Sequence, residues 1–138
     1  MRFVSFVRKG QVSYGLVRGE GVVDLGGRLG HGVTTIRDAI ATQLLQKVDD
    51  FNFSEQPELA WSDITLLPVI PNPSKILCIG LNFQKHKLET GRSDVAYPTV
   101  FTRFADSQVA HGHPMIKPAC SESFDYEGEM AVIIGKGG

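Results

Sequence analysis

One stretch constrains the fold of this chain more than any other, the segment of residues 123–135 with the sequence SFDYEGEMAVIIG. In a β-strand the side chains alternate between two faces, so Asp125, Glu127 and Glu129 would share one face. Burying ionised carboxylates beside the apolar residues 131–134 is costly unless a positive charge compensates them. A hard divalent cation, Mg²⁺, Mn²⁺ or Ca²⁺, would do so. A solvated strand edge is the alternative, and the spacing alone leaves both interpretations open.

Composition limits the class of protein. The chain has 138 residues, of which 42% are hydrophobic and 21% charged, as is usual for a globular protein with its own core. A net charge of −1 offers nucleic acid no basic surface. No stretch has the length of a membrane span, and the amino terminus lacks the apolar segment of a signal peptide. We therefore expect a cytoplasmic protein that binds neither nucleic acid nor membrane.

The first half of the chain shows the signals of a small α+β domain. Residues 3–7, 12–17 and 22–25 read as three strands joined by turns that contain glycine. Thr35 with Asp38 predicts a capping box and the start of a helix. One stripe of this helix is apolar and should face the core, with the members Ile36, Ala39, Ile40, Leu44 and Val48.

A proline-rich stretch, LPVIPNP at residues 67–73, predicts the boundary between two domains, 1–67 and 68–138. The apolar residues 75–79 then predict a strand buried on both faces. Residues 83–89 have helical spacing, and residues 97–104 predict another strand. The whole chain should be mostly β, with α+β character in its first domain.

His86 and Glu89 should lie on the same face of the predicted helix, because they are three residues apart. A carboxylate beside an imidazole orients it and favours its protonated form, as a general base requires. Lys85 and Lys87 flank the pair, however, and a solvated helix face explains such a pattern equally simply. These residues alone favour the solvated face.

Two motifs change that balance, because together they resemble the signature of the fumarylacetoacetate hydrolase family. The first is DYEGEM followed by AVIIGK, at residues 125–136. The second is KILCIGLNF at residues 75–83, followed by the His-x-x-Glu pair. Their order and interval are similar to those in the family, and they cover about the second half of the chain. The resemblance implies that residues 68–138 are the first part of the family's β-roll.

The resemblance also implies site residues. Glu127 and Glu129 match the family's metal ligands, so a Mg²⁺ ion (or Mn²⁺ or Ca²⁺) is expected on them, with Asp125 supporting them without touching the metal. His86, oriented by Glu89, would activate water.

Two further features of the site follow from the family pattern. Residues 90–98 correspond to a lid that moves together with the His-x-x-Glu pair, so residues 83–97 should be the most mobile part of the second half. Arg103, where the family usually has lysine, would contact a substrate anion. Family members continue past Gly138 and carry a third acidic ligand there. We therefore expect the chain to correspond to the amino-terminal half of such an enzyme, a homodimer when full length.

The activity implied first is a metal-dependent hydrolase that cleaves a carbon–carbon bond in a small dicarbonyl acid, a β-diketo acid such as an acylpyruvate or a fumarylacetoacetate-like compound. An isomerase or decarboxylase of a 2-hydroxy-dienedioate, or an oxaloacetate decarboxylase, would use the same scaffold. A third possibility belongs to another class: a catalytically inactive fragment that folds only with a partner.

Overall fold

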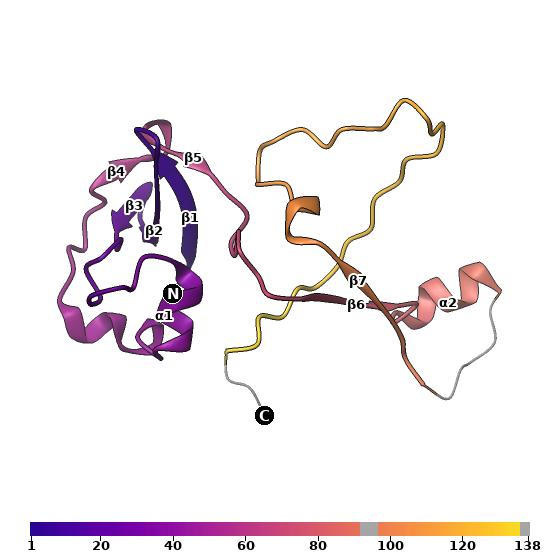
Figure 1. Cartoon of the computed structure of the whole chain (residues 1–138), viewed down its shortest axis with the longest axis horizontal. Helices are drawn as coiled ribbons and strands as arrows, with labels where there is room; N and C mark the ends of the chain where they lie inside the picture. Colours follow the sequence, from indigo (N-terminus) through magenta and orange to yellow (C-terminus); the bar gives the residue numbers. More distant parts are fainter. Residues whose placement is uncertain (92–96, 136–138) are drawn as a thin grey trace. The chain divides into compact units, whose positions relative to one another are not determined.

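The computed structural model describes residues 1–91 and 97–135, which form two compact units (Figure 1). One unit contains residues 1–71 and the chain from residue 109 onward, and the other contains residues 72–108. The domain boundary between residues 67 and 68 stays a prediction.

The first unit is built on an antiparallel sheet of five strands in the order β4-β3-β2-β1-β5. Its strands are β1 (Phe3–Arg8), β2 (Gln11–Arg18), β3 (Gly21–Asp24), β4 (Leu59–Ala60) and β5 (Thr65–Leu66). The predicted three-stranded meander is therefore confirmed as β1 to β3. The sheet gains one short strand on each side, and neither was expected from the sequence.

Helix α1 (Ile36–Ala41) begins at the predicted capping box. The Thr35 hydroxyl accepts a hydrogen bond from the Asp38 backbone N–H at 3.1 Å, and the Asp38 carboxylate accepts one from the Thr35 N–H at 3.0 Å. The helix ends early, because Gln43 has a φ of +59° and leaves the helical region. A 3₁₀ helix, η1 (Leu45–Phe51), follows, and a second one, η2 (Trp61–Asp63), precedes β5.

The core of this unit forms where α1 and η1 pack on the sheet. The residues of the predicted apolar stripe lie in or against this core, as expected, with three of them buried. They do not form one helical stripe, however, because Leu44 and Val48 lie beyond the end of α1. The buried residues of the main cluster are Tyr14, Leu16, Val23, Leu25, Leu29, Val33, Ile36, Ala39 and Val48. A smaller cluster contains Phe6, Val22 and Leu59.

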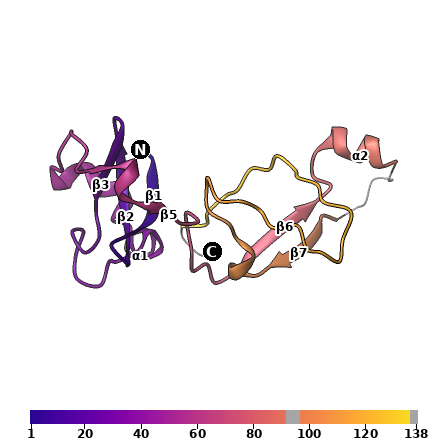
Figure 2. The same cartoon turned by 90° about the horizontal axis from the view of Figure 1, so that it is seen from above.

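The second unit contains an antiparallel pair of strands, β6 (Ile76–Gly80) and β7 (Thr99–Arg103), which Figure 2 shows side by side. Helix α2 (Gln84–Thr90) follows β6, and the 3₁₀ helix η3 (Ala105–Ser107) follows β7. The prediction that β6 is buried on both faces is wrong, since Leu77 is 60% and Ile79 is 44% exposed. A pair of strands without a covering layer cannot exclude water from its apolar side chains.

The predicted strand over residues 123–135 is not formed. In the described part of the segment from residue 109 onward, the structure has turns and irregular backbone, and no strand or helix. Tyr126, Met130 and Ile134 are between 76% and 83% exposed. A strand is held by hydrogen bonds to a neighbour, and none of the described strands pairs with these residues.

The fold is mostly sheet with few helices, in agreement with the predicted α+β class, while the β-roll stays a prediction. None of the helices within residues 1–91 and 97–135 is long and apolar enough to cross a membrane.

Candidate functional site

His86 and Glu89 lie on one face of α2, as the sequence predicts. The His86 Nδ1 is 4.0 Å from the Glu89 Oε2, and the two side chains are 43% and 61% exposed. This separation is too long for a direct hydrogen bond but short enough for an ion pair when the imidazole is protonated. The pair therefore has the arrangement of a base and its orienting carboxylate.

The turn before α2 sets the direction of this helix. Leu81 has a φ of +53°, which is uncommon for a residue other than glycine, and Phe83 is the N-cap residue. At the other end, Gly91 has a φ of +62° and terminates the helix in the left-handed conformation. The GLNF turn recognised in the sequence is thus the joint that connects β6 to the helix of the dyad.

Part of the predicted mobile segment, residues 83–97, can be described. Residues 84–90 form α2, so the dyad lies on a short helix. Residues 92–96, which belong to the predicted lid, lie outside the described residues.

Arg103 is the last residue of β7 and lies opposite Ile76 in the register of the pair. Its side chain is exposed, and within the described ranges it makes no ion pair. The guanidinium is consequently available to an anion in solution, and its role in substrate binding stays a prediction.

Asp125, Glu127 and Glu129 are exposed on the irregular segment. The Asp125 Oδ1 accepts a hydrogen bond from the Tyr126 N–H at 2.8 Å, a local contact that does not fix the segment. Mg²⁺ prefers oxygen ligands such as carboxylates, so Glu127 and Glu129 have the right chemistry to bind it. In the described residues, however, no group of three or more His, Cys, Asp or Glu side chains could hold a metal ion. The predicted metal site stays a prediction, and the dyad belongs to the other unit.

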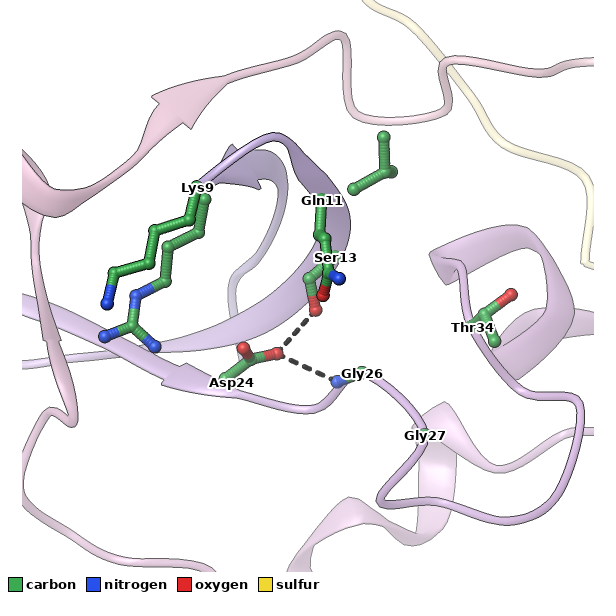
Figure 3. Close-up of a pocket in the computed structure, with 9 residues that line it drawn as sticks. Lys9, Gln11, Ser13, Asp24, Gly26, Gly27 and Thr34 are labelled. Carbon is green, nitrogen blue, oxygen red and sulfur yellow. Dashed lines mark hydrogen bonds between the residues drawn. The ribbon is translucent and has the colours of Figure 1, made fainter.

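Sequence reasoning missed a pocket in the first unit, which Figure 3 shows at the turn between β1 and β2. Its volume is about 380 Å³, and polar side chains of this turn and of the loop after β3 line it. The consecutive cations Arg8 and Lys9 beside a glycine turn were the available signal.

Comparison with known proteins relates the second half of the chain to a known family. The family model described as the C-terminal domain of fumarylacetoacetate (FAA) hydrolase matches residues 75–138. This range contains both motifs on which the resemblance was based.

Among curated proteins, the mitochondrial oxaloacetate tautomerase fahd2 of Xenopus laevis is 42% identical over 85 residues, which are 62% of this chain and 27% of the relative. The human mitochondrial oxaloacetate tautomerase FAHD2B is 35% identical over the same length and shares. The oxaloacetate tautomerase YisK of Bacillus subtilis is 42% identical over 82 residues, 56% of this chain and 27% of the relative.

The matches thus span about a quarter of the length of these relatives. All three relatives have names of enzymes. The range that the family model matches includes the His86–Glu89 pair and the acidic segment of residues 125–129. Residues 75–138 of this chain thus match the fumarylacetoacetate hydrolase family, and the match covers part of the chain.

Proposed function

We propose that this chain supplies part of an active site that interconverts the enol and keto forms of oxaloacetate, a 2-oxo dicarboxylate. The observation that carries the proposal is the pairing of His86 with Glu89 at 4.0 Å, within a family segment whose relatives are named oxaloacetate tautomerases. A base that can both accept and return a proton is the group that this reaction needs.

The reaction moves one proton. In going from enol to keto, the O–H bond at C2 breaks, a C–H bond forms at C3, and the double bond shifts from C2–C3 to C2–O. No water is added and no carbon–carbon bond breaks. His86 would receive the hydroxyl proton on Nε2 and deliver a proton to C3, while Glu89 stabilises the imidazolium between these two events.

Two other parts of the chain have roles in this proposal. Glu127 and Glu129 would provide two oxygen ligands to a Mg²⁺ (or Mn²⁺ or Ca²⁺) ion, with Asp125 as their support, and further ligands would be needed to complete its coordination. When bound, such an ion supplies polarisation of the 2-oxo group. Arg103 would pair with a carboxylate of the substrate in a bidentate manner.

A second candidate is the metal-dependent hydrolase, and the description of the matched family model as a hydrolase favours it. Hydrolysis of an acylpyruvate adds water to the distant carbonyl and then breaks a carbon–carbon bond. His86 would take its proton from water rather than from the enol. The decarboxylase alternative differs again, because it releases carbon dioxide.

A chimaera separates these reactions. The matching segment of the Bacillus subtilis tautomerase would be replaced by residues 75–138 of this chain and tested with enol-oxaloacetate and with an acylpyruvate. The proposal expects loss of the enol absorbance without release of carbon dioxide, and no cleavage of the acylpyruvate. Cleavage of the acylpyruvate would favour the hydrolase, and carbon dioxide release would favour the decarboxylase. A folded chimaera that is inactive in every assay would favour the inactive fragment.

A further inference from the structure

The pocket in the first unit gathers charges that the proposed function does not use. The β1–β2 hairpin contributes Arg8 and Lys9 to its lining, and the end of β3 contributes Asp24. Figure 3 shows Lys9 and Ser13 on the hairpin and Asp24 beside the glycine turn that follows β3. Within the described ranges, neither Arg8 nor Lys9 has an ion-pair partner, so no carboxylate of the protein contacts either charge directly.

The backbone of the hairpin turn independently indicates a functional site at this pocket. Arg8 pairs with Gln11, and the two residues between them have φ values of +49° at Lys9 and +79° at Gly10. Positive φ at both positions is typical of a type I′ turn, where Asn, Asp or Gly normally occupies the first position. A lysine there costs conformational free energy, and such strain is found preferentially at functional sites. The residue in this strained conformation, Lys9, is also one of the residues that line the pocket.

Asp24 is held in position on the other side. Its Oδ1 accepts hydrogen bonds from the Ser13 hydroxyl at 2.5 Å and from the Gly26 N–H at 3.0 Å. A Cβ at Gly26 would collide with the Ser13 hydroxyl, so the glycine is needed for this arrangement. The Oδ2 of Asp24 has no hydrogen-bond partner in the part of the chain that the structure describes. One carboxylate oxygen is therefore oriented and available to a donor.

We propose that this pocket binds a small hydroxy-carboxylate, with its carboxylate against Arg8 and Lys9 and its hydroxyl donating to the Oδ2 of Asp24. Two cations and one carboxylate leave a net charge of +1, which a monoanion neutralises. A phosphate dianion exceeds this net charge, and the Asp24 carboxylate repels its second negative charge. The volume of about 380 Å³ is within the range of small-molecule sites. This inference does not depend on the proposed function of the second half.

The test is a titration of the whole chain, followed by the NMR shifts of the Gly10 and Gly26 amides. Glycerate, which has a carboxylate and hydroxyls, should give saturable shifts. Propionate, which lacks a hydroxyl, should bind about tenfold more weakly or not at all, because one hydrogen bond to a charged group is lost. A parallel titration with inorganic phosphate tests whether the pocket binds a phosphate in preference to a hydroxy-carboxylate. No saturation with glycerate, or binding of propionate or phosphate as tight as that of glycerate, would overturn the proposal.

Lys9→Asn tests the role of the strained lysine. The variant removes the charge but suits the turn, so glycerate affinity should fall about tenfold while the midpoint of thermal unfolding stays the same or rises. Lys47→Asn is the matched control, because this exposed lysine lies in η1 outside the pocket lining. Equal affinity of Lys9→Asn and the unmodified chain would overturn the proposal.

Discussion

Replacing Tyr14 by phenylalanine should stabilise the first unit, although most core substitutions destabilise a protein. Tyr14 lies on β2 with an exposure of 0%, inside the main core cluster. Its buried hydroxyl has no hydrogen-bond partner among the described residues. Leaving such a group buried and unpaired costs about 1–3 kcal/mol. Tyr14→Phe removes the oxygen and keeps the ring, so we expect the free energy of unfolding to rise by about 1 kcal/mol, the lower end, because a small void is left.

Urea unfolding of the whole chain, followed by circular dichroism, measures this change. Tyr126→Phe is the matched control, because that side chain is 82% exposed and its loss should alter the free energy by less than about 0.5 kcal/mol. A Tyr14→Phe variant that is less stable by about 1 kcal/mol would instead show that the hydroxyl makes a favourable hydrogen bond.

The pH dependence of unfolding provides a second measurement on the same residue. Burial raises the pKa of Tyr14 from 10.0 to about 12, with smaller contributions from the Asp38 and Asp24 carboxylates. Because the folded pKa lies above the unfolded one, the unfolded state loses this proton first. The stability linked to Tyr14 is therefore complete below pH 10 and is lost as the pH rises towards 12. In Tyr14→Phe this alkaline loss should be absent.

Three more predictions concern the cap, the sheet and the acidic segment. Thr35→Ala should lower the free energy of unfolding by about 1 kcal/mol. Because the Thr35 hydrogen bonds lower the pKa of Asp38, the stability contributed by the cap should be lost as the pH falls below the ordinary carboxyl pKa of 3.8. Urea unfolding across that pH range measures both effects. Gly15→Ala should cost about 1–3 kcal/mol in the same assay, since a Cβ there would collide with β3; unchanged stability would contradict the packing described. In the chimaera, Glu127→Gln combined with Glu129→Gln should abolish the dependence of the rate on added Mg²⁺, and a retained dependence would remove both residues from the metal site.

The first half of the fold was predictable because its signals are local. Alternating strands, glycine turns and the Thr35–Asp38 box each act within a few residues, and all agree with the observed meander and helix. The two-residue strands β4 and β5 were missed, since their pairing partners are distant in sequence. The early end of α1 was missed as well, because nothing in the sequence indicates a positive φ at Gln43.

In the second half, the sequence predicts structure that depends on distant neighbours, and these predictions failed. The apolar sequence of β6 and the alternation of residues 123–135 predict buried and paired strands, but burial and pairing depend on neighbours that these sequences do not contain. The structure accordingly leaves Leu77 exposed and the acidic segment irregular. The dyad was recoverable because His86 and Glu89 are three residues apart on one helix. The pocket at the hairpin was not, because it combines residues from two separate loops.

In the proposed reaction, His86, with Glu89 beside it, transfers the proton between the enol oxygen and C3 of oxaloacetate. The most direct test is the rate of enol-to-keto conversion by the chimaera carrying His86→Gln, compared with the chimaera carrying Lys85→Gln, a change in the neighbouring residue of the same helix. We predict that His86→Gln lowers the rate by roughly 10²–10⁴-fold, the usual contribution of a positioned acid–base group, while Lys85→Gln changes it little. An unchanged rate in His86→Gln, in a chimaera that remains folded, would show that His86 does not transfer this proton.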